Sequence, residues 1–226
     1  MGRYLSLYSQ MRYSEIFFDL DGTLTDPYEG ITKSVQHSLR YFDINVADRN
    51  ELKCFIGPPL WESYMKYYGL TKEQAEEAVK YYREYFSVTG LFENEVYEGV
   101  PELLEELKSK GLRLTVATSK PAIFSERILD KFDLAKYFDF LSGSELDGTR
   151  VNKADVIEYA IENLGITDRS SILMVGDRLH DIKGAHKCGV EACGVLWGYG
   201  DRNEHTECGA DYIAATLNEL KEIILQ

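Results

Sequence analysis

Short apolar runs alternate with helical patterns along most of the chain. The first run, Glu15–Phe18, predicts a buried strand that ends directly before Asp19. Four later runs predict further strands at residues 112–117, 138–141, 171–175 and 192–196. Apolar residues recur at helical spacing in residues 101–110, 122–131, 153–164, 180–188 and 217–225. This alternation predicts an α/β fold: a Rossmann-like, doubly wound parallel sheet with right-handed crossovers.

Residues 27–96 break the alternation, because they contain no convincing strand pattern. Two helical faces stand out instead, formed by Ile31, Val35, Leu39 and Phe42, and by Ala75, Ala78, Val79, Tyr82 and Phe86. The sequence therefore predicts an all-helical insert at residues 27–96, carried by a Rossmann-like core of residues 11–26 and 97–226. The tyrosines of the insert occur at helical spacing, which favours packing over a stacking platform; they are Tyr64, Tyr67, Tyr68, Tyr81, Tyr82 and Tyr85.

Composition and charge narrow the classes of partner. The chain has 226 residues and a hydrophobic fraction of 44%, as expected for a soluble α/β domain with a small insert. Its formal net charge of -13 disfavours binding to nucleic-acid polymers. Any phosphate site must therefore be made locally positive by a cation, a lysine or backbone N–H groups.

The cysteines and the N-terminus indicate a cytoplasmic protein. The four cysteines show neither a C-x-x-C pair nor zinc-ligand spacing, so we expect reduced thiols. The first residues lack the apolar run of a signal peptide, and no stretch approaches the roughly 20 apolar residues of a membrane span. A start at Met11 would be natural, which leaves open whether residues 1–10 are native.

Two carboxylates follow the first predicted strand. They belong to the sequence Asp19-Leu-Asp21-Gly22-Thr. A simple turn or part of a calcium loop would also place acids here, but a calcium loop needs further acids at fixed spacing, and these are missing. In an open parallel sheet, ligands bind at the carboxyl ends of the strands. Asp19 and Asp21 are therefore candidates for chemistry.

Hydroxyls and a lysine occupy comparable positions farther along. Thr118 and Ser119 follow the second core strand and could bind phosphate oxygens, although such residues are more often helix caps. Lys153 begins a predicted helix and could neutralise a phosphate, although a lone lysine is more often a surface residue. Neither signal is specific by itself.

A second acidic pair follows the strand predicted at residues 171–175. Asp177 and Asp181 lie in the sequence Gly176-Asp-Arg-Leu-His-Asp. Magnesium prefers carboxylate oxygens, water and substrate phosphate as ligands. Asp19 and Asp177 could bind the ion directly from neighbouring strand ends, with Asp181 acting through water or orienting the other ligands.

These four elements, in this order, resemble the motifs of the haloacid dehalogenase superfamily. The resemblance covers nearly the whole chain from Met11 onward, and D-x-D-G-T and G-D-x-x-x-D are its specific parts. The chain is most similar to the phosphoglycolate phosphatase and 5′-nucleotidase-like group, which carries a helical cap between the first two motifs. Residues 18–25, 56–60, 116–121 and 175–181 carry this similarity. Many relatives have Lys-Pro at the third motif, where this chain has Lys153-Ala154.

The resemblance implies a role for each site residue. Asp19 would be the nucleophile that forms an aspartyl phosphate, and Asp21 the acid and base that moves protons. Phosphate oxygens would be held by Gly22, Thr118, Ser119 and Lys153. The Mg²⁺ ligands would come from Asp19, Asp21 through its backbone carbonyl, Asp177 and Asp181. A turn in the cap, Gly57-Pro58-Pro59, would either touch the leaving group or simply connect helices.

The resulting hypothesis is a Mg²⁺-dependent phosphatase that acts on a small phosphorylated metabolite such as phosphoglycolate or a nucleoside monophosphate. It involves no membrane and no nucleic-acid polymer, and it makes no prediction of the oligomeric state. Two alternatives stay open: a phosphotransferase or mutase of the β-phosphoglucomutase type, and a non-catalytic binding module that kept the fold.

Overall fold

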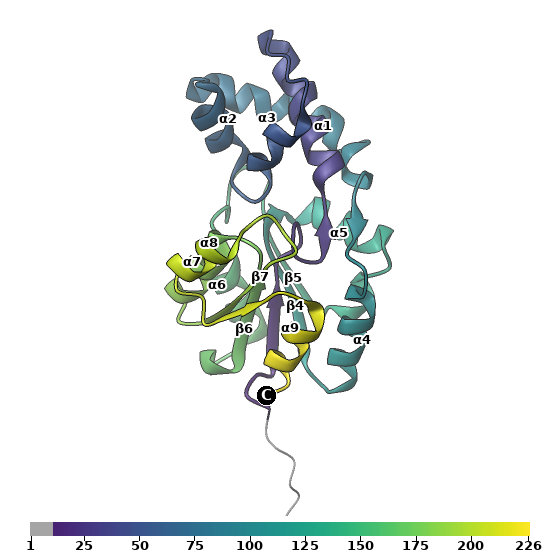
Figure 1. Ribbon diagram of the computed structural model, residues 1–226, viewed down its shortest axis with the longest axis vertical. Coiled ribbons are helices and arrows are strands. Elements are labelled where there is room, and N and C mark those ends of the chain that lie inside the picture. The colour runs from purple at the N-terminus through teal and green to yellow at the C-terminus, as the bar shows by residue number, and fades with distance from the viewer. Residues whose placement is uncertain (1–10) are drawn as a thin grey trace, which may run out of the picture.

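A six-stranded parallel sheet forms the centre of the molecule, as a computed structural model that describes residues 11–226 shows (Figure 1). The question about residues 1–10 lies outside the described residues. The strands are β1 (Glu15–Phe18), β4 (Arg113–Pro121), β5 (Phe140–Ser144), β6 (Ile172–Gly176), β7 (Glu191–Val195) and β8 (Tyr212–Ala214). Their order is β5-β4-β1-β6-β7-β8, and every neighbouring pair is parallel. The predicted fold class is confirmed.

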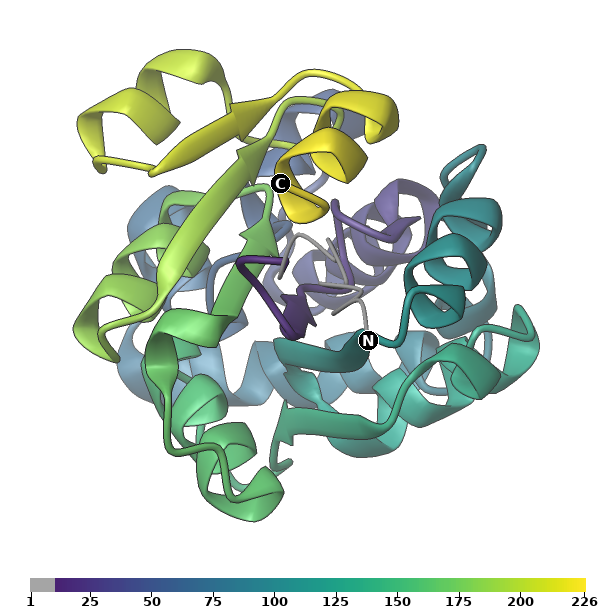
Figure 2. The same cartoon turned by 90° about the horizontal axis from the view of Figure 1, so that it is seen from below.

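Helices cover both faces of this sheet, as Figure 2 shows from below. The helices α4 (Val100–Ser109), α5 (Ala122–Lys131) and α9 (Leu217–Ile224) contribute to one apolar cluster, and α6 (Lys153–Leu164) and α7 (Leu179–Lys187) to the other. Residues of β1 alternate between the two clusters: Ile16 and Phe18 belong to the first and Phe17 to the second. Because both faces of the strand are covered, its sequence is a nearly continuous apolar run.

β8 and the short helix α8 (Arg202–Glu207) were not predicted. β8 has three residues at the edge of the sheet, and Tyr212 and Ile213 are only partly buried, so its pattern is weak. β4 also continues past the predicted end at residue 117 to Pro121. Its register with β5 shifts between Ala117 and Pro121. Within the described residues, no helix has both the length and the apolar character needed to cross a bilayer.

The insert packs as a helical layer beyond the carboxyl ends of the core strands, at the top of Figure 1. It contains α1 (Tyr28–Leu39), α2 (Leu60–Tyr68) and α3 (Lys72–Phe86). Short 3₁₀ helices lie at Arg40–Phe42, Arg49–Phe55 and Gly90–Phe92 in the insert, and at Ala135–Tyr137 and Arg169–Ser171 in the core. Most of the predicted apolar positions are buried, whereas Phe42 and Val79 are half-buried. Tyr64 and Tyr82 are buried packing residues, and Tyr67 is 44% exposed.

A two-stranded antiparallel ribbon joins the insert to the core. It pairs β2 (Thr25–Asp26) with β3 (Glu95–Val96). The expectation that residues 27–96 contain no strand is therefore wrong for the last two. Strands of two residues carry no periodicity, so no hydrophobic pattern could indicate this ribbon. The chain enters and leaves the insert side by side at this point.

Within the insert, the backbone of α1 packs directly against the backbone of the segment around Gly90. A Cβ added at Gly30 would lie 1.9 Å from the carbonyl oxygen of Gly90. Gly30 is buried, so neither the helix nor the neighbouring turn can move into free space. Close packing of backbones therefore requires glycine at this position in α1.

We predict that Gly30→Ala destabilises the protein, although alanine normally favours a helix interior by about 1 kcal/mol over glycine. The clash should reverse the sign and cost about 1–3 kcal/mol, the usual range for overpacking. Urea unfolding would measure this loss. Glu76→Ala, at an exposed position of α3, is the matched control and should be nearly neutral. Equal stability of Gly30→Ala and the wild type would contradict the proposed backbone contact.

Candidate active site

The predicted acids meet because they follow neighbouring strands at the same edge of the sheet. Asp19 comes directly after β1, and Asp177 directly after β6, which pairs with β1. The amide of Asp19 donates to the carbonyl of Val175 at 2.9 Å, which continues the ladder to the last residue before the site. Asp181 lies in the first turn of α7 and joins the group from there.

Asp19, Asp177 and Asp181 form a buried carboxylate triad. One oxygen from each lies within 4.8 Å of the others. The three residues are 7%, 1% and 1% exposed, respectively. Three carboxylates so close together and so far from water are costly unless positive charge compensates them.

Lys153 supplies part of that compensation. Its Nζ lies 2.8 Å from Asp19 Oδ1 and 2.8 Å from Asp181 Oδ1, and it donates to the carbonyl of Ala117 at 3.0 Å. The side chain is 3% exposed, so the alternative of a surface lysine does not hold. The ammonium thus fixes the nucleophile candidate relative to the triad.

A second ion pair, which was not predicted, joins Asp21 to Lys120. Lys120 Nζ contacts Asp21 Oδ2, and the two side chains are 8% and 12% exposed. Lys120 Nζ also lies 4.8 Å from the ring centroid of Phe86 in α3, so it faces the insert. Only the hydroxyls of the Thr118-Ser119-Lys120 segment were predicted to act at the site, although a cation two residues beyond Thr118 was the available signal for Lys120.

The remaining candidates take different positions. Thr118 is 2% exposed at the site, and its hydroxyl accepts from the amide of Lys120 at 3.2 Å. Ser119 is half-buried, and its carbonyl accepts from the Ser144 hydroxyl at 2.8 Å. Gly22 has φ +83, and a Cβ there would lie 2.2 Å from Asp177 Oδ2, so glycine allows the turn to approach the triad.

The insert reaches the site through the turn at Gly57. The Arg178 guanidinium, next to Asp177 in the chain, donates to the carbonyl of Ile56 at 2.8 Å and to Glu204 at 3.0 Å. A Cβ at Gly57 would lie 3.1 Å from Arg178 Cγ. The predicted turn therefore lies against the core beside a residue adjacent to the triad.

Burial and mutual repulsion dominate the acid–base properties of the site. Burial, together with Asp181 and Asp19, holds the pKa of Asp177 well above its usual range. Burial raises the pKa of Asp181 to about 6 despite the opposing effect of Lys153. Burial also raises the pKa of Asp21, and Lys120 counteracts it. Desolvation opposes the charge of Lys153, but Asp181 and Asp19 together outweigh it and raise that pKa.

The site fits a divalent cation. Four carboxyl groups surround two lysines, so the fully ionised site carries two more negative charges than positive ones. Asp21 Oδ1 is buried and makes no hydrogen bond within residues 11–226. The triad offers only oxygen atoms, which are the ligands of hard cations such as Mg²⁺. A divalent cation would balance the charge that the two lysines leave.

Comparison with known proteins gives consistent results. The sequence profile of the family described as "Haloacid dehalogenase-like hydrolase" matches residues 16–195. A 5′-nucleotidase of Pseudomonas aeruginosa is 45% identical over 214 residues, which cover 95% of this chain and 96% of that protein. The tyrosine-protein kinase PtkA of Mycobacterium tuberculosis is 38% identical over 92% of this chain and 72% of its own length.

Solved structures agree with the sequence comparison. The crystal structure of a "predicted phosphatase" from Clostridium acetobutylicum superposes with a TM-score of 0.92 at 50% identity, covering 94% of this chain and 98% of that one. A putative phosphatase from Clostridium difficile gives 0.86 at 49% identity, covering 96% and 100%.

We predict that Mg²⁺ raises the melting temperature in a pH-dependent manner. The metal must displace protons from carboxyls whose pKa is raised, to about 6 for Asp181. Stabilisation should therefore be full at about pH 8 and be lost as the pH falls through about 6. Thermal unfolding with and without Mg²⁺ across this range measures it. An equal shift at about pH 8 and about pH 5 would argue against metal binding by these carboxylates.

Proposed function

The chain belongs to the haloacid dehalogenase-like hydrolase family, and we propose that it is a Mg²⁺-dependent phosphatase that forms an aspartyl phosphate on Asp19. The observation that carries this proposal is the buried triad of Asp19, Asp177 and Asp181 with Lys153 bound to two of its members. A carboxylate held beside an ammonium and a metal site suits attack on phosphorus, because both cations offset the charge of the phosphoryl oxygens.

In the first step, Asp19 attacks the phosphorus in line. A bond forms between its carboxylate oxygen and phosphorus while the bond to the leaving oxygen breaks, and Asp21 gives that oxygen a proton. Thr118, Ser119 and the turn at Gly22 would hold phosphoryl oxygens. Lys153 would keep Asp19 in place and offset charge on the same oxygens.

Mg²⁺, when bound, would supply further charge compensation and would be held by Asp19, Asp177 and the backbone carbonyl of Asp21, with Asp181 supporting this set. In the second step, Asp21 takes a proton from water, which attacks the phosphorus and releases Asp19 and inorganic phosphate. Lys120 would hold Asp21 in position between the two steps. The same residue thus serves as acid and then as base.

The helical insert, residues 27–96, would act as a cap. Its helices lie over the strand ends, and the β2–β3 ribbon is its double connection to the core (Figure 1). Closure would exclude water during transfer, and opening would release the product. Lys120 under Phe86, and Arg178 at the carbonyl of Ile56, are contacts between insert and core that such a motion would change.

For the substrate, we propose small phosphomonoesters, with nucleoside 5′-monophosphates first and 2-phosphoglycolate second. The name of the 45% identical relative, 5′-nucleotidase, supports this order. The test is release of inorganic phosphate by the purified protein from a panel containing both classes, with Mg²⁺ or with EDTA. Mg²⁺-dependent release from a nucleoside 5′-monophosphate is expected, and release from no member of the panel would contradict the proposal.

A phosphotransferase is the second candidate, because a 38% identical relative is named a tyrosine-protein kinase. It would share the first step and differ in the acceptor, which would be a hydroxyl compound in place of water. Measuring both free phosphate and phosphorylated acceptor in one reaction separates the two. We expect free phosphate to account for the substrate consumed.

We predict that Asp21→Asn separates the two half-reactions. p-Nitrophenolate leaves without a proton, so p-nitrophenyl phosphate should still phosphorylate Asp19, whereas deprotonation of water by residue 21 is lost. The expected signal is a burst of p-nitrophenol equal to the enzyme concentration, followed by little turnover. Stopped-flow absorbance would record it.

Glycolate provides the matched leaving group for this experiment, because it needs a proton to depart. With 2-phosphoglycolate, Asp21→Asn should therefore show no burst, and its rate should fall by about 10²–10⁴-fold. Normal turnover of both substrates by Asp21→Asn would show that Asp21 does not move the protons.

A further inference from the structure

The segment Trp197-Gly198-Tyr199, which follows β7, lies directly against the triad. The amide of Tyr199 donates to Asp177 Oδ2 at 2.7 Å. A Cβ at Gly198 would lie 2.4 Å from Asp177 Cβ, so this backbone and the turn at Gly22 enclose the carboxylate between them. The orientation of the Asp177 carboxylate therefore depends on the position of the Tyr199 backbone.

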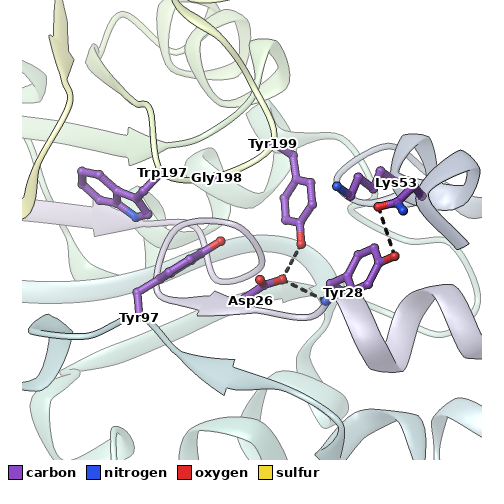
Figure 3. A pocket seen from close by; sticks show the side chains of 8 residues that line it. Asp26, Tyr28, Lys53, Tyr97, Trp197, Gly198 and Tyr199 are labelled. Atoms are coloured by element: carbon purple, nitrogen blue, oxygen red, sulfur yellow. Dashed lines mark hydrogen bonds between the residues drawn. The ribbon is translucent and has the colours of Figure 1, made fainter.

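The side chain of Tyr199 extends in the other direction, to the connection between core and insert (Figure 3). Its hydroxyl donates to Asp26 Oδ1. The same oxygen accepts from the amide of Tyr28 at 3.0 Å, at the first residue of α1. Tyr199 thus contacts a triad residue through its backbone and the start of the insert through its hydroxyl.

Asp26 lies at the connection between the core and the insert, so a movement of the insert would displace it. It is the last residue of β2, and it pairs with Glu95 of β3, so both chain connections meet beside it. A cavity of about 300 Å³ adjoins the Tyr199 ring, lined among others by Asp26, Tyr97 and Trp197. Rotation of the insert about the ribbon would displace Asp26 and either break its bond to Tyr199 or carry the ring with it.

The other end of the segment is fixed to the core turn. The Trp197 indole N–H donates to the carbonyl of Thr23 at 3.0 Å. A displacement of the Tyr199 side chain would therefore rotate the short segment from Trp197 to Tyr199 and would not move the whole loop. This rotation would change the position of the Tyr199 amide, which orients Asp177.

We propose that Tyr199 is a positioning residue that couples the orientation of Asp177, and so metal binding, to the position of the helical insert. The inference rests on the proposed function, because it requires the metal. Groups that hydrogen-bond a ligating carboxylate typically change metal affinity by about 10–100-fold when altered. Coupling between binding and conformation is reciprocal, so metal binding should in turn hold the insert in the position in which the Tyr199–Asp26 bond is made.

The test compares Tyr199→Phe with Tyr97→Phe. Both variants remove one hydroxyl from the same cavity, and the Tyr97 hydroxyl makes no hydrogen bond to Asp26 (Figure 3). Two quantities are measured for each protein: the Kd for Mg²⁺ by calorimetry, and hydrogen exchange of residues 24–30 and 93–98 with and without Mg²⁺. Thermal unfolding without metal checks that both variants are folded.

In the wild type and in Tyr97→Phe, Mg²⁺ should slow exchange across these two segments. In Tyr199→Phe, the Mg²⁺-dependent slowing should disappear and the Kd should rise by about 10-fold, the lower end of the range because the amide N–H remains. Failure of the wild type to bind Mg²⁺ would overturn both this inference and the proposed metal dependence.

Two other results would overturn the inference alone. The first is Mg²⁺ binding to the wild type without any change in exchange at the two segments. The second is Tyr199→Phe with the affinity and the protection of Tyr97→Phe, which would reduce the hydroxyl to a packing role. Either result would leave phosphatase activity and its metal requirement as proposed.

Discussion

The clustering of four carboxylates, three of them buried, around two lysines is the constraint on which the rest of the structure depends. Lys153 pairs with Asp19 and Asp181, and Lys120 contacts Asp21, but the fully ionised site keeps two negative charges that neither lysine balances. A protein tolerates such an arrangement when a bound cation completes it. The glycines around Asp177 allow the backbone to approach it closely, and the amide of Tyr199 donates to its carboxylate.

Much of the core and of the triad could be predicted from sequence, for a simple geometric reason. Apolar runs covered on both faces mark parallel strands, and residues that directly follow such strands must meet at one edge of the sheet. Asp19 and Asp177 were found in this way. β8, the β2–β3 ribbon and the pairing of Lys120 with Asp21 were not, because they depend on two or three residues or on contacts between segments about a hundred residues apart.

The arrangement separates two tasks between two parts of the chain. The sheet carries the groups that would act on phosphorus. The helical insert, joined by a ribbon of two-residue strands, reaches Lys120 beside Asp21 through Phe86. Such a division would allow differently named relatives of this chain, among them a 5′-nucleotidase and a tyrosine-protein kinase, to differ in activity on a similar fold. The reaction shared by such proteins would depend on the core, and the choice of partner for the phosphoryl group on the insert and the residues that face it.

Locating the transferred phosphoryl group on the protein tests the central claim most directly. The purified chain would be mixed with Mg²⁺ and p-nitrophenyl phosphate, quenched in acid within one turnover, and digested for peptide mass spectrometry. The account predicts one phosphoryl group on the peptide that contains Asp19, sensitive to hydroxylamine and absent from Asp19→Asn. Phosphate release by Asp19→Asn at the wild-type rate, or a phosphoryl group on another residue, would contradict it.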